Sequence, residues 1–365
     1  MKYYIIAGEP SGDIYGSRII KQIKKNNPQS EIRCWGGDLM QKSGGILIKH
    51  YQNLAFMGFL EVVKNIFKIL KNLSFCKKDI LNFNPDKIIF IDYPGFNLRI
   101  AKWAKKNNFN TFFYISPQVW AWKENRVLSI KKYIDNMYVI LPFEKDYFLK
   151  KHNYKVQYFG HPLVTIIDES LKANNSDSIE VDRPIIAILP GSRKQEISLI
   201  LNKILKVVKD FKEYEFVIAG LKHINFDLYK NAIRKNNVSV RVVFDNTYEL
   251  LKKADAAIVT SGTATLETAL IGTPQIVCYI TNPINMLLAK LFVKIKFISL
   301  VNLILNKETV RELIQSDVNK KNIKKELSLI LGSRKNEIKK DYESLRNLLS
   351  GEKIEEKIVR HIIKN

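Results

Sequence analysis

The chain has 365 residues, of which 46% are hydrophobic, so it can form two globular domains with separate cores. Lysine and arginine number 59 against 36 acidic residues, which gives a formal net charge of +23. A basic protein binds nucleic acid, an anionic membrane or a phosphorylated ligand, unless the charge reflects a compositional bias toward Lys, Asn and Ile. The lysines are dispersed and no zinc-finger or RNA-binding signature occurs, so nucleic acid is not expected as a partner.

The three cysteines, Cys34, Cys76 and Cys278, are far apart and suit a reducing compartment. They predict neither a disulfide framework nor a metal site. No run of 18 uncharged apolar residues occurs, so no transmembrane helix is expected. The apolar run 3–7 is too short for a signal peptide.

The amino-terminal sequence predicts a buried strand (3–7), a glycine-rich loop (8–13) and a helix (14–25). This succession is typical of a doubly wound α/β sheet, in which ligands bind at the carboxyl ends of parallel strands. The loop lacks the G-x-G-x-x-G spacing, so no nicotinamide or flavin cofactor is inferred. We favour a ligand-facing role for the loop over a structural one. Its candidate residues are Glu9, Ser11, Gly12 and Asp13.

Four further strands are predicted in the first half, at 86–92, 111–115, 138–141 and 156–159, and residues 33–38 are interpreted as another strand end and turn. Asp92 ends the first of these, where catalytic groups concentrate in such sheets, although it can instead cap the next helix. Trp120 lies in the loop after the second strand and is a candidate contact for the acceptor or the cleft. His161 lies in a Gly-His-Pro turn at the end of the first domain, and we interpret it as a ligand contact. A lone histidine is more often structural.

Two segments combine apolar residues with lysines. Residues 51–75, which include Met57, show a helical period, and residues 285–304 are apolar and basic. Each is either an ordinary buried segment or an exposed surface that contacts acyl chains and anionic lipid.

The polar stretch 172–183 is predicted to be a linker, because strand–helix alternation resumes after it. The predicted strands of the second half are 185–189, 216–219, 240–244, 256–259 and 275–279. The pattern predicts two Rossmann-like domains with parallel sheets facing a central cleft. The first covers residues 1–172 and is completed by helices in 340–365, and the second covers 183–339.

The segment 185–196 reads as a strand, a tight turn and a helix start, which together form an anion site. Gly191 and Ser192 form the turn, Ser192 is a candidate helix cap, and Gln195 or Glu196 would close a capping box. Arg193 adds a cationic fork suited to phosphate. The alternative is an ordinary capped helix.

A second strand–loop–helix anion site follows the strand 256–259. Small residues there let the backbone approach a diphosphate, and a carboxylate in the first helical turns can hold the two hydroxyls of a ribose. The candidates are Ser261, Gly262, Thr263, Ala264 and, for the ribose, Glu267. Residues 332–338 nearly repeat 191–197 but follow a helical pattern, so we interpret them as a turn between helices without a site.

With these features assembled, the chain resembles the lipid-A-disaccharide synthase family from end to end. The matching motifs lie at 7–13, 57–62, 91–97, 116–122, 141–144, 160–161, 189–193, 261–267, 298–302 and 312–315.

The resemblance implies a GT-B fold and an inverting, metal-independent glycosyl transfer. UDP-2,3-diacylglucosamine would be the donor and 2,3-diacylglucosamine 1-phosphate (lipid X) the acceptor, giving the β-1,6 lipid A disaccharide 1-phosphate and UDP. It also implies Asn302 as a donor contact. The enzyme would be cytoplasmic and peripherally bound to the inner face of the inner membrane of a Gram-negative bacterium. Both a monomer and a homodimer through the C-terminal tail stay open.

The sequence departs from the family pattern at two places. Gly95 replaces an acid, which leaves Asp92 as the carboxylate of its loop, and Val301, Asn306 and Lys307 replace Pro, Gly and Arg. We expect Asp92 to act as the base, and Arg193 with nearby N–H groups to hold the diphosphate. The rival enzyme is another GT-B protein that uses UDP-N-acetylglucosamine, such as a peptidoglycan glycosyltransferase or a 2-epimerase. A non-catalytic lipid-binding or nucleotide-binding protein is the rival from another class.

Overall fold

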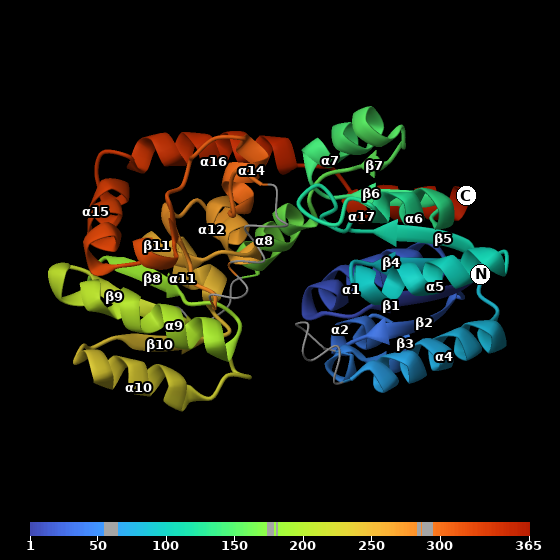
Figure 1. Cartoon of the computed structure of the whole chain (residues 1–365), viewed down its shortest axis with the longest axis horizontal. Helices are drawn as coiled ribbons and strands as arrows, with labels where there is room; N and C mark the ends of the chain where they lie inside the picture. Colours follow the sequence, from blue (N-terminus) through green and yellow to red (C-terminus); the bar gives the residue numbers. More distant parts are fainter. Residues whose placement is uncertain (55–64, 174–178, 180–181, 283–285, 287–294) are drawn as a thin grey trace. The chain divides into compact units, whose positions relative to one another are not determined.

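A computed structural model gives the structure of the chain (Figure 1). It describes residues 1–54, 65–173, 179, 182–282, 286 and 295–365. The chain divides into two compact units. The first unit comprises Met1–Pro162 and Gly351–Asn365, and the second comprises Leu163–Ser350.

The first unit is built on a seven-stranded sheet with the order β3-β2-β1-β4-β5-β6-β7, in which every described pairing is parallel. The strand order reverses between β1 and β4, and ligands of doubly wound sheets bind at such a reversal. The strands are β1 (Lys2–Ala7), β2 (Glu31–Gly36), β3 (Ile46–His50), β4 (Lys87–Ile91), β5 (Asn110–Tyr114), β6 (Asn136–Val139) and β7 (Gln157–Tyr158).

Helices connect these strands, and the last helix of the chain returns to this unit. The helices are α1 (Pro10–Asn26), α2 (Asp38–Lys42), α4 (Ile66–Phe83), α5 (Pro94–Lys106), α6 (Arg126–Tyr133), α7 (Pro142–Asp146) and α17 (Ile354–Lys364), with a 3₁₀ turn at Tyr51–Asn53 and a π-helix at Tyr147–Lys151. The ring of His361 on α17 lies 2.9 Å from the Tyr138 hydroxyl, and Glu355 forms an ion pair with Arg18 of α1. The C-terminal helix therefore packs on the amino-terminal unit of its own chain.

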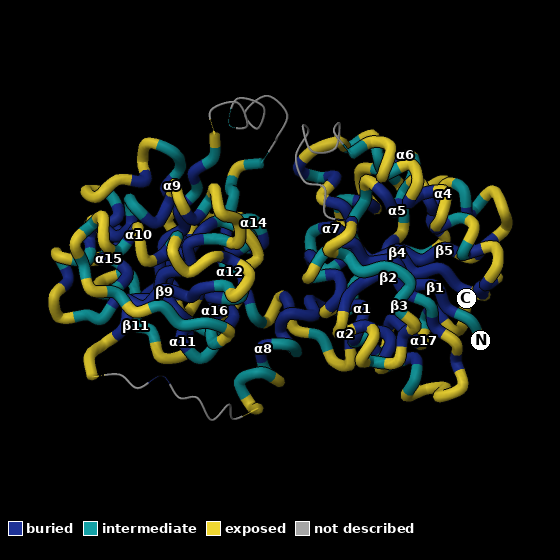
Figure 2. Tube along the Cα trace, turned by 90° about the horizontal axis from the view of Figure 1, so that it is seen from below, coloured by how far each residue is buried: buried dark blue, intermediate teal, exposed yellow. Residues whose placement is uncertain are grey.

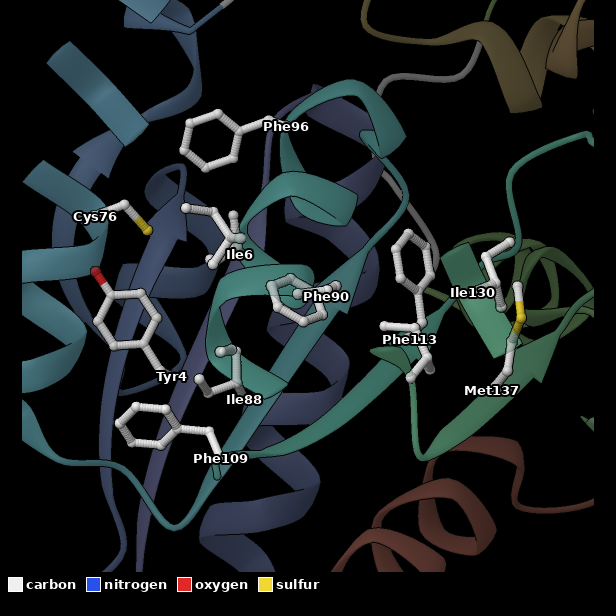
Figure 3. Close-up of a cluster of buried hydrophobic side chains, with 14 of the residues drawn as sticks. Tyr4, Ile6, Cys76, Ile88, Phe90, Phe96, Phe109, Phe113, Ile130 and Met137 are labelled. Carbon is white, nitrogen blue, oxygen red and sulfur yellow. The ribbon is translucent and has the colours of Figure 1, made fainter. Parts of the chain in front are cut away.

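One hydrophobic core cluster of this unit lies between the sheet and helices α4, α5 and α6 (Figure 3). Tyr4 of β1, Phe90 of β4 and Phe113 of β5 are fully buried in it, together with Cys76 of α4. Burying each large apolar side chain stabilises the fold by roughly 1.5–3 kcal/mol. The three cysteines are all buried and unbonded.

The second unit contains a six-stranded sheet with the order β10-β9-β8-β11-β12-β13, again parallel in every described pairing. Its strands are β8 (Ile185–Leu189), β9 (Glu215–Gly220), β10 (Arg241–Phe244), β11 (Ala254–Thr260), β12 (Gln275–Tyr279) and β13 (Glu312–Ile314). Its helices are α8 (Pro162–Lys172), α9 (Lys194–Ile204), α10 (Phe226–Asn236), α11 (Thr247–Lys253), α12 (Thr263–Ile271), α14 (Leu300–Leu305), α15 (Lys320–Leu331) and α16 (Lys335–Leu349), with 3₁₀ turns at Leu205–Asp210 and Gln315–Asp317.

The central strands of both sheets are buried along most of their length, whereas the exposed segments lie on helices and loops (Figure 2). Strands covered on both faces read as continuous apolar runs, which is why they were predictable. Two short strands, β3 and β13, were not predicted. In β3 no residue is fully buried, and β13 has three residues, so neither carries a strong apolar signal.

The unit boundaries differ from the predicted domain boundaries. Helix α8 and helix α16 both group with the second unit, so the first unit ends at Pro162 and resumes at Gly351. The Arg346 side chain of α16 explains this grouping, because it pairs with Asp168 of α8 and donates to the Leu270 carbonyl of α12.

The turn at 332–334 joins α15 to α16, so the prediction of a helix–helix turn there is confirmed. Within the described residues, no helix is both long and apolar enough to cross a membrane.

Candidate functional site

Both predicted anion loops of the second unit line one cavity of about 310 Å³. The loop after β8 and the loop after β11 are adjacent because β8 and β11 pair directly in the sheet. The cavity therefore lies at the carboxyl ends of two neighbouring parallel strands, where ligands of such sheets bind. Its lining comprises Leu189, Pro190, Gly191, Ser192, Glu196, Ala219, Leu221, Thr247, Thr260, Ser261, Gly262, Thr263, Ala264 and Glu267.

The first loop turns at Gly191, whose φ of +107° is left-handed and favours glycine. Helix α9 then begins at Lys194, with Arg193 as its N-cap and no side-chain capping bond. The prediction of Ser192 as the cap, closed by a capping box, is therefore wrong. Arg193 has extended backbone and occupies the cap position itself, which leaves Ser192 exposed before the helix.

The Arg193 guanidinium lies 3.3 Å from Oε1 of Glu196, and its side chain is 62% exposed. An exposed ion pair of this kind contributes little to stability, roughly 0–1 kcal/mol. The side chain can therefore exchange Glu196 for a phosphate at small cost.

The second loop ends at Gly262, the exposed N-cap of α12. The Thr265 side chain donates to the Gly262 carbonyl at 2.8 Å, and the Ser261 hydroxyl donates to the Ile298 carbonyl at 3.0 Å. Exposed Thr263 and partly exposed Ala264 begin the helix. These hydrogen bonds fix the loop so that the amino end of α12 lies at the cavity. This arrangement is suitable for binding an anion.

Glu267 lies one turn into α12 and lines the same cavity. Its Oε1 accepts a hydrogen bond of 2.7 Å from the Tyr248 hydroxyl on α11. Burial raises the pKa of the Glu267 carboxyl, and the bond from Tyr248 lowers it. The carboxylate is thus oriented before any ligand binds.

In the first unit, Asp92 follows β4 and has a left-handed φ of 45°, as does Tyr93 with 49°. Two successive non-glycine residues in this region carry backbone strain, which tends to collect at functional sites. Burial and the nearby charge of Glu9 raise the pKa of Asp92 to about 7, and the backbone bond from Tyr93 lowers it. A carboxylate with a pKa near neutrality suits a general base.

The Asn97 side chain supports this strained turn from inside the protein. Asn97 is fully buried, and its Nδ2 donates to the Asp92 carbonyl at 2.7 Å and lies 3.3 Å from the Ile6 carbonyl. The alternative interpretation, that Asp92 caps the next helix, does not hold, because Tyr93 is the N-cap of α5 and no side-chain capping bond forms.

A family model described as lipid-A-disaccharide synthetase matches residues 3–363. A lipid-A-disaccharide synthase from Trichlorobacter lovleyi is 35% identical over 334 residues, covering 90% of this chain and 87% of the relative. Another from Syntrophus aciditrophicus is 36% identical over 358 residues, covering 94% and 92%. The chain belongs to the lipid-A-disaccharide synthetase family. Membership makes it an enzyme, a glycosyltransferase.

Solved structures show the same fold at low identity. A UDP-GlcNAc 2-epimerase from Neisseria meningitidis bound to UDP-GlcNAc superposes with a TM-score of 0.67 at 15% identity, covering 100% of both chains. The calicheamicin glycosyltransferase CalG4 gives 0.62 at 10%, covering 100% of this chain and 98% of that one. These likenesses confirm two Rossmann-like parallel-sheet domains of the GT-B kind. The family match, and not the fold, separates this synthetase-family member from the epimerases.

The prediction of a loop at 8–13 is wrong for most of its residues, because α1 already begins at Pro10, and a ligand-facing role for this segment stays a prediction. Ser11 and Gly12 lie in its first turn, and a Cβ on Gly12 would come within 2.9 Å of Ala7. Asp13 is buried, and its carboxylate accepts bonds from the N–H groups of Gly37, Leu39 and Met40 at 2.8–3.1 Å. It thus holds the start of α2. Glu9, the N-cap of α1, is partly exposed and lies near Asp92.

Two other predicted contacts of the first unit have internal partners. His161 is buried, and burial lowers its pKa to about 3, so the ring is neutral. The Trp120 indole donates to Oε1 of buried Glu144 at 3.2 Å and packs edge-on against Phe143. Glu144 also accepts from the Leu141 N–H at 3.0 Å. Trp120 therefore anchors its loop, and its ring stays partly exposed.

The structure places the side chain of Asn302 inside the fold, and its role as a donor contact stays a prediction. It is fully buried on α14, where Nδ2 donates to the Val310 carbonyl at 2.8 Å and to Glu312 at 2.9 Å, and Oδ1 accepts from the Val310 N–H at 3.0 Å. Its hydrogen-bonding groups are used inside the fold. Met57 and most of the segment 285–297 lie outside the described residues.

Sequence reasoning missed Tyr248 and Thr247, which stand at the amino end of α11 beside Glu267. The available signal was their position directly after the predicted strand 240–244, since loops at that end of a parallel strand bind ligands.

Proposed function

We propose that the chain catalyses its family's reaction with a donor site in the second unit and a catalytic base in the first. The donor is UDP-2,3-diacylglucosamine and the acceptor is 2,3-diacylglucosamine 1-phosphate. The products are the β-1,6 disaccharide 1-phosphate and UDP. The observation that carries this proposal is the convergence of two anion loops and Glu267 on one cavity, in a chain that matches the family throughout.

The cavity suits the UDP part of the donor. Backbone N–H groups near Ser192 and Thr263 would bind the diphosphate at the amino ends of α9 and α12, and Arg193 would leave Glu196 to pair with it. Glu267, held by Tyr248, would accept hydrogen bonds from the two ribose hydroxyls. The remaining lining of Gly191, Ser261, Gly262 and Ala264 lets the backbone approach the phosphates closely.

Asp92 would act as the base of an inverting transfer. Its carboxylate takes the proton from the acceptor hydroxyl while that oxygen attacks the anomeric carbon from the face opposite UDP. The new carbon–oxygen bond forms as the bond to the diphosphate breaks, and UDP leaves with the electron pair. The pKa of about 7 keeps the carboxylate ionised in part at neutral pH while making it basic enough to accept a proton.

One assay tests the substrate assignment. UDP release is measured with the diacylated donor, with and without lipid X, and compared with release from UDP-N-acetylglucosamine. We expect release only with the diacylated donor and lipid X together. Release that needs no acyl chains, or no acceptor, would reject the assignment.

The role of Asp92 is tested by Asp92→Asn. Turnover should fall by a factor of at least about 10², the usual size of a general-base contribution, while UDP affinity stays unchanged. Asp38→Asn is the matched control, because Asp38 is an exposed aspartate of the same unit. Normal turnover in Asp92→Asn removes Asp92 from the base role.

We further propose that α4 contacts acyl chains or the bilayer. Its first turns expose Ile66, Phe67 and Leu70 by 37%, 84% and 52%. Exposed Lys68 and Lys71 alternate with them, as expected for a helix at an anionic interface. The enzyme would therefore bind peripherally to the inner face of the inner membrane. The apolar, basic segment 285–297 is proposed to contribute through Lys290, Lys294 and Lys296.

Flotation with phosphatidylglycerol vesicles tests the membrane proposal. Phe67→Ser with Leu70→Ser should lose vesicle binding, and glutamate at Lys290, Lys294 and Lys296 should weaken it. Leu128→Ser is the matched control, because Leu128 is 72% exposed on α6 of the same unit. Equal binding by all variants would count against membrane contact.

A homodimer that exchanges α17 stays a prediction, to be checked by light scattering of the full chain.

A further inference from the structure

The loop after β5 presents an exposed tryptophan with two cations against it. Trp122 is 44% exposed, the Lys123 ammonium lies 4.5 Å from the centre of its ring system, and the Arg126 guanidinium lies 5.4 Å from it. We refer to Trp122, Lys123 and Arg126 as the Trp122 cluster.

Two like charges share one ring system. Among the described residues, neither Lys123 nor Arg126 forms an ion pair with a carboxylate. Glu124, between them in sequence, pairs instead with Lys151 and His152 at 2.6 and 3.1 Å. One cation on an indole is a common surface feature, but a second adds repulsion. Burial and the charge of Arg126 lower the pKa of Lys123 accordingly.

The cluster is held in place by its loop. Lys123 has a left-handed φ of 53°, and the Arg126 N–H donates to the Lys123 carbonyl at 3.0 Å. Val119 and Ala121 are buried, and Trp120 is tied to Glu144. The backbone that carries the exposed ring and its two cations is therefore fixed in a folded turn, which lowers the entropy lost on binding.

The cluster belongs to the same edge of the sheet as the proposed base. The loop follows β5, Asp92 follows β4, and these strands are direct neighbours. The Asp92 N–H donates to the carbonyl of Tyr114, the last residue of β5, at 3.0 Å. A ligand at this edge of the first unit can therefore approach the loops of both strands.

We propose that the Trp122 cluster binds the phosphate group of the acceptor, a sugar 1-phosphate. This inference rests on the proposed function. A phosphate monoester carries between one and two negative charges at neutral pH, which two cations match. The Arg126 guanidinium offers paired donors for phosphate oxygens, and the Trp122 face offers an apolar surface for the sugar ring.

Steady-state kinetics with lipid X test the proposal. Lys123→Gln and Arg126→Gln should each lower kcat/KM for lipid X by about tenfold, the usual loss for a charge-assisted hydrogen bond, with the KM for the donor unchanged. Lys132→Gln is the matched control, because Lys132 lies 5.8 Å from the Tyr133 ring on the same helix and should leave both values unchanged. Arg126→Lys should restore part of the loss.

Inhibition by soluble sugars separates phosphate recognition from a general disturbance of the loop. Glucosamine 1-phosphate should inhibit the unmodified enzyme at lower concentrations than glucosamine, and this difference should shrink about tenfold in Arg126→Gln. Equal inhibition by the two sugars in the unmodified enzyme would overturn the proposal. So would an equal kcat/KM loss in Lys132→Gln.

A lipid headgroup also carries phosphate, so binding to phosphatidylglycerol vesicles is measured for the same variants. We expect vesicle binding to be unchanged. Weaker vesicle binding with unchanged kinetics in detergent micelles would assign the cluster to the membrane and overturn the proposal. If the unmodified enzyme releases no UDP with lipid X, the proposed function itself fails, which is a different result from any of these.

Discussion

The Tyr248 hydroxyl donates a 2.7 Å hydrogen bond to Oε1 of Glu267, so a tyrosine on α11 fixes the carboxylate that we assign to the ribose. Tyr248→Phe removes this bond and should weaken UDP binding about threefold to tenfold, with little change in kcat, since a typical hydrogen bond contributes roughly 0.5–1.5 kcal/mol. Calorimetry with UDP measures the effect.

A comparison with 2′-deoxy-UDP makes this test specific for the ribose. The unmodified enzyme should prefer UDP, and Tyr248→Phe should reduce that preference. Tyr214→Phe, at a partly exposed tyrosine of the same unit, is the control and should retain it. A preference that survives in Tyr248→Phe would mean that Glu267 does not depend on Tyr248.

The bond from Asn97 to the Asp92 carbonyl predicts a second effect. Asn97→Ala removes the amide that supports two left-handed residues, each of which costs roughly 1–2 kcal/mol, so Asp92 should lose its fixed position. We expect kcat to fall at least about tenfold while UDP affinity stays unchanged, because the proposed UDP site lies in the second unit. Asn107→Ala, at the other end of α5, is the control. Loss of UDP binding in Asn97→Ala would indicate general unfolding instead.

The contrast between Asp92 and Asp13 shows what the sequence could predict. Asp92 follows a fully buried strand, and the strand alone places it at the ligand-binding edge of the sheet. Asp13 also follows the first strand closely, yet its partners are N–H groups of α2, some 24 to 27 residues away. Local pattern cannot reveal a partner that tertiary packing supplies.

Asn302 and Glu267 also show that side-chain partners could not be predicted from the sequence. A motif placed Asn302 at the donor, but its three bonds to Val310 and Glu312 consume its side chain inside the fold. Glu267 was predicted from its position in a helix start, whereas its partner Tyr248 was not, because the two helices carrying them are brought together only by the sheet. Strands and loops were thus predictable, and side-chain pairing was not.

The raised pKa of Asp92 predicts the pH dependence of the reaction. A base must be deprotonated, so kcat/KM should rise with pH and level off above about 7. Glu9→Gln removes a like charge beside Asp92 and should therefore move the rise in kcat/KM to lower pH. The pH profile of kcat/KM measures both. The prediction is contradicted if kcat/KM rises near the usual pKa of a carboxyl group. It is also contradicted if Glu9→Gln does not shift the pH at which kcat/KM rises.

The turn at Gly191 gives a prediction with a closely matched control. A Cβ at this position would lie 3.0 Å from Oε2 of Glu196 and 3.4 Å from Cγ2 of Thr260, at a φ of +107°. Gly191→Ala should therefore cost roughly 1–2 kcal/mol of stability and also deform the loop that we assign to the diphosphate. UDP affinity should fall at least about tenfold, since the lost N–H contacts are to a charged group.

Gly272→Ala separates strain from site geometry. Gly272 also has a left-handed φ, +98°, but among the described residues no atom beyond its chain neighbours lies within 4 Å of the added Cβ. The residue ends α12, away from the amino end that lines the cavity. It should lose similar stability in thermal unfolding, because the backbone strain is the same in kind, and should keep its UDP affinity in calorimetry. If UDP affinity falls equally in both variants, the fall follows from reduced stability of the second unit. The loop after β8 is then not the diphosphate site.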